Sequence, residues 1–138
     1  MTEAIQTEFE IARQAYADDD RVTARNSYAR GAALARELNK PLLRAFALQH
    51  LAGIDRDADR PAEAMAHAEQ SLALYRRHGE GSSLDAANAQ RQIALSLDGL
   101  RRLPAAEKAW TEARELYVAL GAEEAVAECD ARLTEAAE

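Results

Sequence analysis

The 138-residue sequence contains one cysteine, three prolines and six glycines, and only 5% of its residues are aromatic. A single cysteine forms neither an internal disulfide nor a cysteine-based zinc site, so folding needs no oxidising compartment. The β-branched residues are few and never cluster, which argues against a β-sheet fold. No stretch approaches the twenty apolar residues of a membrane span, and the first residues lack the basic and apolar parts of a signal peptide. We therefore expect a cytoplasmic protein.

Positive charge is scarce relative to negative charge, with 17 lysines and arginines against 24 aspartates and glutamates and a formal net charge of −7. The basic residues form no continuous tract, whereas nonspecific affinity for nucleic acid depends on clustered positive charge. We therefore expect neither nucleic acid nor a membrane as a partner. Apolar residues make up 48% of the chain, which excludes intrinsic disorder and predicts one domain over residues 1–138.

Alanine, glutamate, arginine and leucine, which are strong helix formers, dominate the composition and predict an all-α fold. Glycine, proline, asparagine and aspartate gather in short groups, where they end one helix or begin the next. The segments between these groups predict seven helices, at about 2–17, 20–38, 41–57, 60–78, 83–99, 103–120 and 122–136.

A pattern of small and aromatic residues recurs three times along the chain. Its triplets, spaced by four and then three residues, are Ala24-Tyr28-Gly31, Ala64-Ala68-Ser71 and Ala106-Trp110-Ala113, and the middle triplet has alanine where the other two have an aromatic residue. An aliphatic-alanine pair precedes each triplet by twelve residues, as Ile11-Ala12, Leu51-Ala52 and Ile93-Ala94. The alanines of these pairs are 40 and 42 residues apart, so the repeating unit is a helical hairpin.

Small residues are expected where two helices cross closely, because both helices cannot carry bulk at the contact. Larger neighbours are expected to fill the space between hairpins, namely Ile11, Leu51, Ile93, Tyr28, Trp110, Leu34, Leu74 and Leu116. A single hairpin cannot bury its own apolar side, so the hairpins must stack. The last helix carries one apolar stripe, formed by Ala122, Val126, Cys129 and Leu133, and otherwise mostly acidic residues, which is typical of a capping helix.

The pattern resembles the tetratricopeptide repeat, in the long-helix variant found in kinesin light chains and bacterial regulators. The resemblance covers residues 5–121. It implies a right-handed α-α superhelix with repeats at about 2–38, 41–78 and 83–120 and a capping helix at about 122–136. Ala15 and Asp55 depart from the family pattern, which commonly has leucine or an aromatic residue at these places in the first helix.

The resemblance also implies a concave groove, lined by the first helix of each repeat, that holds a peptide or helix of a partner protein. The groove residues that we predict are Phe9, Arg13, Tyr16, Gln49, Arg56, Asn88 and Arg91. One arginine per repeat, Arg13, Arg56 and Arg91, is expected to pair with ligand carboxylates. Gln49 and Asn88 are expected to bond an extended backbone. We therefore expect an acidic or amphipathic segment as the ligand.

Two known binding modes of the family are not supported by the sequence. The places of the lysine, asparagine and arginine clamp for a C-terminal carboxylate carry Phe9, Arg13, His50, Asn88 and Gln92 here. The asparagine ladder of the pheromone-sensing and kinesin light chain members is matched only by Asn88.

Several residues and short runs could carry specific chemistry, but each has a simpler structural explanation. The acidic run from Asp55 to Asp59 has the spacing of a calcium loop but lacks its glycine and its final glutamate, so we interpret it as a polar turn between helices. The three histidines show no zinc-binding spacing. Cys129 is expected to be a buried apolar residue, and the Ser71 hydroxyl to bond a carbonyl of its own helix. We expect no enzyme activity, no cofactor and no metal.

The leading hypothesis is a non-catalytic protein-interaction module with an adaptor or regulatory role. The alternative is self-association into a homodimer, through an apolar stripe left open on the first helix or through the last helix. The stripe on the first helix consists of Ile5, Phe9, Ala12 and Tyr16.

Overall fold

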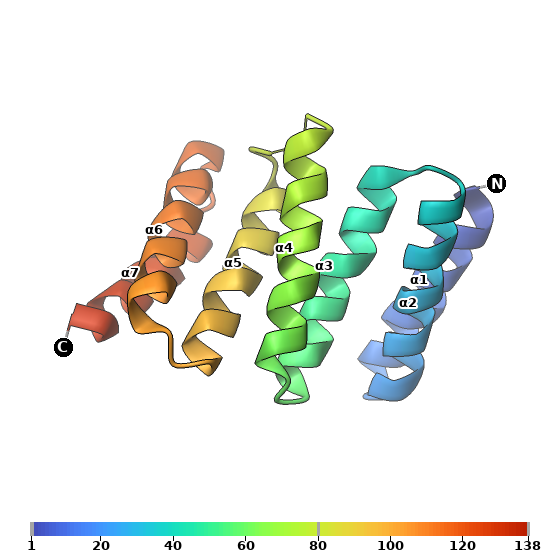
Figure 1. The fold of residues 1–138 in the computed structure, drawn as a ribbon, viewed down its shortest axis with the longest axis horizontal. Helices are drawn as coiled ribbons and strands as arrows, with labels where there is room; N and C mark the ends of the chain where they lie inside the picture. Colours follow the sequence, from blue (N-terminus) through green and yellow to red (C-terminus); the bar gives the residue numbers. More distant parts are fainter. Residues whose placement is uncertain (1, 80, 138) are drawn as a thin grey trace.

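The computed structural model describes residues 2–79 and 81–137, and within these ranges it contains seven α-helices and no strand. The all-α fold predicted from the composition is confirmed. The helices are α1 (Thr2–Ala17), α2 (Arg21–Glu37), α3 (Pro41–Asp57), α4 (Pro61–Arg77), α5 (Leu84–Gly99), α6 (Leu103–Leu120) and α7 (Glu123–Ala137). They form a row in which α1 and α2 lie at one end and α6 and α7 at the other (Figure 1).

Local signals explain why the helices begin where they do, and each predicted boundary lies within one residue of the observed one. The side chains of Asp20 and Ser83 accept hydrogen bonds from backbone N–H groups in the first turns of α2 and α5. Pro41 and Pro61 begin α3 and α4, where a missing N–H costs nothing.

The turns between helices share one geometry, with a left-handed residue just after the helix. This residue is Asp19 (φ 62°), Asn39 (54°), Asp59 (60°) or Arg101 (61°) in four turns and Gly79 (86°) or Gly121 (70°) in two others. In the first turn, the next N–H, of Asp20, donates to the carbonyl of Ala15 at 2.8 Å, which is a Schellman motif. The left-handed residues recur every 20 residues with one interval of 22, so each helix with its turn is a unit of nearly constant length.

Consecutive helices pack against each other along the whole row, and α3 also contacts α5. The residues of all three repeated triplets are buried, as the pattern predicts. The alanines of the three aliphatic-alanine pairs, Ala12, Ala52 and Ala94, are fully buried. At Gly31 an added Cβ would lie 2.6 Å from Cε1 of Phe9, so only glycine lets α1 and α2 approach this closely.

Two packing predictions are wrong. Ile11 is 43% exposed. Its counterparts Leu51 and Ile93 pack on a hairpin that precedes their own, whereas α1 follows no other helix in the described part of the chain. The hydroxyl of Ser71 donates to the carbonyl of Ala45 in α3 at 2.7 Å, because the small residue brings it against the neighbouring helix.

Candidate functional site

A cavity of about 290 Å³ lies between α1, α3 and α5, the first helices of the three hairpins. Four of the predicted groove residues line it: Arg13 and Tyr16 from α1, and Gln49 and Arg56 from α3. A second depression of about 420 Å³ continues from it along α5 and α7, and Asn88 and Arg91 line this part. Because Gln49 borders both hollows, the structure brings six of the seven predicted side chains to one face, which we call the concave face.

Phe9 does not belong to this face, and its prediction as a groove residue is wrong. Its side chain is 7% exposed, and its ring packs on Tyr28 and Phe46 at centroid distances of 6.0 and 5.2 Å. The close approach of α2 at Gly31 turns this position into core.

The apolar stripe predicted to be open on α1 is closed, because Ile5 and Ala12 are fully buried within the chain. Tyr16 is the exposed member, at 46%, and its hydroxyl donates to Oδ2 of Asp57 at 2.9 Å. The apolar stripe of α7 also packs inside the chain, against the core that contains Trp110. Within the described residues the chain itself therefore covers most of the α1 stripe and part of the α7 stripe.

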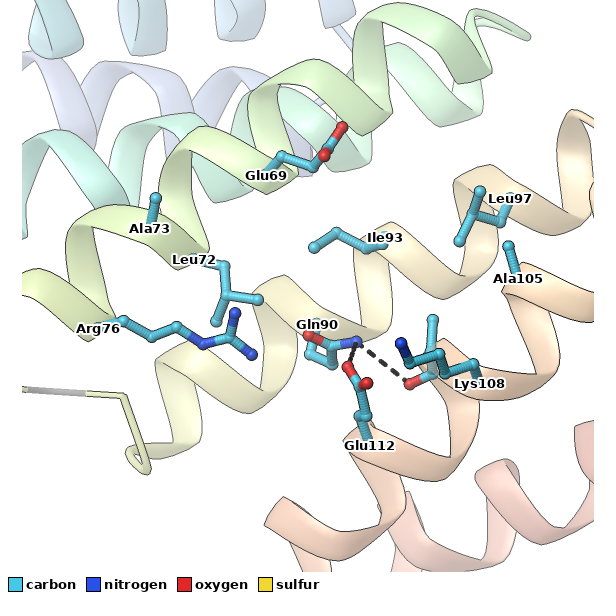
Figure 2. A pocket seen from close by; sticks show the side chains of 11 residues that line it. Glu69, Leu72, Ala73, Arg76, Gln90, Ile93, Leu97, Ala105, Lys108 and Glu112 are labelled. Atoms are coloured by element: carbon cyan, nitrogen blue, oxygen red, sulfur yellow. Dashed lines mark hydrogen bonds between the residues drawn. The ribbon is translucent and has the colours of Figure 1, made fainter.

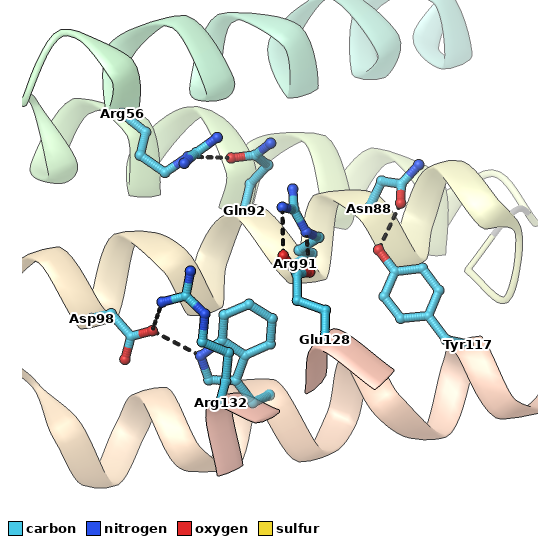
Figure 3. Close-up of polar contacts among 9 residues, drawn as sticks. Arg56, Asn88, Arg91, Gln92, Asp98, Tyr117, Glu128 and Arg132 are labelled. Carbon is cyan, nitrogen blue, oxygen red and sulfur yellow. Dashed lines mark hydrogen bonds and ion pairs between the residues drawn. The ribbon is translucent and has the colours of Figure 1, made fainter. Parts of the chain in front are cut away.

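The three arginines of the predicted groove differ in their partners. Arg13 pairs with Glu10 of its own helix at 2.7 Å, with both side chains 68% exposed. Arg56 donates from Nε to Oε1 of Gln92 at 3.3 Å (Figure 3). Arg91 donates from Nε and Nη2 to the two carboxylate oxygens of Glu128 in α7, at 2.5 and 2.9 Å.

The pair between Arg91 and Glu128 changes what this end of the face can bind. Its hydrogen bonds lower the pKa of the Glu128 carboxyl below its ordinary value, although partial burial opposes this shift. Arg91 therefore already holds a carboxylate of its own chain, and the interpretation of Arg91 as a free ligand contact is corrected. Arg13 and Arg56 are the two predicted arginines without a bidentate partner within the described residues.

Two amide side chains of the face, those of Gln49 and Gln92, are more deeply buried than the arginines. Gln49 is 8% exposed, and its Oε1 is buried with no hydrogen-bond partner within the described residues. Gln92 is also 8% exposed, and its Nε2 lies 3.4 Å from the place that a Cβ on Gly53 would take. Asn88 accepts a hydrogen bond of 2.6 Å from the Tyr117 hydroxyl, which leaves its amide N–H groups to donate.

An aromatic wall closes one side of the cavity. The ring of His50 stacks on that of Tyr28, with centroids 5.0 Å apart and planes inclined by 8°. Burial lowers the pKa of His50, so the ring is neutral at pH 7. This wall offers an apolar, uncharged surface next to the polar side chains of α3 and α5.

Gln92 and Tyr117 lie at the concave face but are not among the seven predicted groove residues. Gln92 follows Asn88 by four residues, a spacing that places both on one side of α5. This spacing predicts that Gln92 lies on the same face as Asn88. Tyr117 lies in α6, a second helix of a hairpin, and no local pattern links it to Asn88.

The acidic run at the end of α3 does not form a calcium loop. Asp55 lies in α3 rather than in a turn, is 1% exposed, and its Oδ2 lies 2.7 Å from Nδ1 of His67. Its Oδ1 lies 3.4 Å from Nε of Arg25. Among the described residues, no group of three or more histidine, cysteine, aspartate or glutamate side chains is placed to hold a metal ion.

A further cavity of about 310 Å³ lies on the other side of α5, between α4 and α6 (Figure 2). Leu72, Ile93 and Leu97 form its apolar part, and Gln90 lies buried at its base. The amide of Gln90 donates to the Ala109 carbonyl at 3.3 Å and to Glu112 Oε2 at 3.1 Å. Its donor group is thus used within the chain, in contrast to the buried oxygen of Gln49.

Two other observations concern the cysteine and the possibility of a membrane-spanning helix. Cys129 is fully buried, and burial raises the pKa of its thiol, so it packs as an apolar side chain. In the part of the chain that the structure describes, none of the helices combines the length and apolar character that crossing a bilayer requires.

Comparison of the sequence with models of known protein families gives no match, and comparison with curated proteins gives none either.

Proposed function

We propose that the chain is a non-catalytic protein-interaction module of the tetratricopeptide type, a right-handed superhelix that binds an extended acidic or amphipathic segment on its concave face. The observation that carries this proposal is the convergence of Arg13, Tyr16, Gln49 and Arg56 on one cavity between α1, α3 and α5. Side chains from separate helices border one hollow there, and a cavity with a few placed polar groups is the usual form of a binding site.

Arg13 and Arg56 are the proposed contacts for the acidic groups of the partner. An arginine binds a carboxylate through two parallel hydrogen bonds, which gives both affinity and orientation. The existing pair between Arg13 and Glu10 is largely exposed to solvent. Such exposed pairs contribute little, so a carboxylate of the partner replaces Glu10 at small cost.

Affinity capture with matched charge-reversal variants tests this proposal. The test variant is Arg13→Glu with Arg56→Glu, and the control variant is Arg60→Glu with Arg102→Glu, which makes the same charge change at exposed helix N-caps. We expect a partner that is retained by the wild-type chain and the control and lost by the test variant. Equal retention by the test variant would place the binding surface elsewhere. Circular dichroism verifies that all three chains are helical.

Sedimentation velocity addresses the alternative of self-association. Because the stripes on α1 and α7 are used within the chain, we expect a monomer at micromolar concentration. A concentration-dependent dimer would favour the alternative.

A further inference from the structure

The two hollows of the concave face carry opposite residual charges. The hollow between α1, α3 and α5 is lined by two cations and one anion, namely Arg13, Arg56 and Asp57. The hollow along α5 and α7 is lined by one cation and two anions, namely Arg91, Glu124 and Glu128. His50, which also lines the first hollow, is neutral at pH 7 because burial lowers its pKa. The lining of the face is therefore positive at its α1 end and negative at its α7 end.

The aspartate of the first hollow is already matched by groups of the chain. Oδ2 of Asp57 accepts a hydrogen bond of 2.9 Å from the Tyr16 hydroxyl and lies 3.4 Å from Nη1 of Arg21. Its Oδ1 lies 3.6 Å from Nη2 of Arg56. Asp57 therefore offers little to a cation of a partner. The charge that remains for a ligand is that of Arg13, whose pair within α1 is exposed to solvent and contributes little.

The second hollow also holds one matched pair and one remaining charge. Arg91 donates two hydrogen bonds to the carboxylate of Glu128. Glu124 lines the same hollow, is exposed, and has no ion-pair partner within the described residues. It lies in the first turn of α7, where the helix dipole stabilises a negative charge. Glu124 is thus the carboxylate that a ligand cation meets.

Neutral amides occupy the middle of the face. Gln49 and Gln92 border both hollows. Figure 3 shows Gln92 between Arg56 and Arg91. Asn88 keeps its N–H groups for a ligand carbonyl, because its oxygen accepts from a tyrosine hydroxyl. Such groups suit the uncharged backbone between two charged ends of a bound segment.

We propose that the concave face binds an extended segment with opposite charges at its two ends, in one orientation. Acidic residues of the segment lie against Arg13 at the α1 end, and basic residues lie against Glu124 at the α7 end. This inference rests on the proposed function and specifies the charge pattern and placement of the partner. A uniformly acidic segment brings its second end against Glu124, and like charges facing each other across an interface lower the affinity.

Peptides of three charge patterns test the proposal, each acetylated at the start and amidated at the end. The bipolar peptide has two glutamates, a neutral spacer of alternating serine and alanine, and two lysines. The acidic peptide has two glutamates at both ends, and the basic peptide has two lysines at both ends. Spacers of five, seven and nine residues cover about 17–30 Å in extended conformation. Binding is followed by NMR titration of the isotope-labelled chain at low salt, where exposed charges are least screened.

The bipolar peptide is expected to bind about fivefold more tightly than the acidic and the basic peptide at its best spacer, because a favourable charge contact replaces an unfavourable one. Glu124→Lys should remove this advantage and make the acidic peptide the tighter ligand. The matched control Glu123→Lys makes the same charge change in the same turn of α7 outside the hollow, so it should keep the advantage. Circular dichroism verifies that both variants are helical.

Spin labels locate the two ends of the bound peptide. A nitroxide is attached, before mixing, to a cysteine added beyond either the acidic or the basic end of the bipolar peptide. The label at the acidic end should broaden amide signals of α1 near Arg13. The label at the basic end should broaden those of α7 near Glu124.

The outcomes distinguish this inference from the proposed function. Binding of the acidic peptide at least as tight as that of the bipolar peptide at every spacer, lost in Arg13→Glu with Arg56→Glu, overturns the inference and leaves the acidic-segment function standing. An advantage that persists in Glu124→Lys, or broadening of the same helix by both labels, likewise overturns the inference. Absence of binding by every peptide, or tightest binding by the basic one, contradicts the proposed function, and the inference falls with it.

Discussion

Replacement of Asp55 by asparagine is expected to destabilise the chain at the centre of the array. Asp55 is buried in α3 at a position equivalent to Leu97 of the third hairpin, and it contacts His67 of α4 and Arg25 of α2. Its carboxylate therefore ties three helices together. Asparagine keeps the shape of the side chain and removes its charge.

The magnitude follows from the two contacts. A hydrogen bond to a charged group contributes about 1.5–3 kcal/mol and a neutral one about 0.5–1.5 kcal/mol, so the contact with His67 weakens by about 1–1.5 kcal/mol. Arg25 is 45% exposed and 3.4 Å away, so its pair adds at most about 0.5 kcal/mol. We expect a total loss of about 1–2 kcal/mol. With an unfolding entropy of about 0.3 kcal/mol/K for 138 residues, the melting temperature falls by about 3–7 °C.

Thermal unfolding followed by circular dichroism measures this loss. His67→Gln, made alone and together with Asp55→Asn, completes a double-mutant cycle, and we expect a coupling energy of about 1 kcal/mol. An unchanged melting temperature in Asp55→Asn, together with additive effects in the double variant, would refute the stabilising role of this contact.

Three further changes test other parts of the structure. Gly31→Ala should lower the free energy of unfolding by about 1–3 kcal/mol, because the new Cβ meets the Phe9 ring. A urea unfolding midpoint similar to that of the wild-type chain would contradict this packing. Trp110→Ala should lower the free energy of unfolding by about 3–5 kcal/mol, because it empties a fully buried site and removes the hydrogen bond of 2.9 Å from Nε1 to Asp98. An unchanged free energy of unfolding in urea would show that the repeat register is wrong. Burial lowers the pKa of His50 below its ordinary value near 6.5, so the unfolded chain takes up more protons on acidification and stability falls from about pH 7.5 towards 5. His50→Phe should therefore flatten the melting temperature over this pH range, and an unchanged slope would exclude His50 as its source.

The helices could be predicted from the sequence because their signals are local. Pro41 and Pro61 begin helices, and Asp20 and Ser83 cap them, within a few residues of the groups that they affect. The repeat register was also readable, because the small residues of the three triplets are needed at the helix crossings and are buried there. These features depend on neighbours within one turn or on a pattern that recurs.

The candidate site could be predicted only in part, because its polar partners come from distant segments. Helical spacing placed Arg91 on the correct face, but its partner Glu128 lies 37 residues later and no spacing rule connects the two. Spacing also placed Phe9 beside Arg13, whereas the close approach of α2 draws the ring into the core. Helical spacing therefore predicts which residues share a face. Which of them are buried, and which are paired with another side chain, depends on tertiary packing.

The order in which the helices contact one another also affects how the chain folds. Each helix packs chiefly on the helix before it and the helix after it, so most native contacts are local in sequence and close at small entropic cost. Folding is expected to start within one hairpin and to extend outward. Within the described residues α1 and α7 pack substantially on one neighbour each, whereas α3 packs on three. The edges of the concave face, with Arg13 and Glu128, are therefore expected to open most readily, while Gln49 lies on α3, which like α5 packs on three other helices.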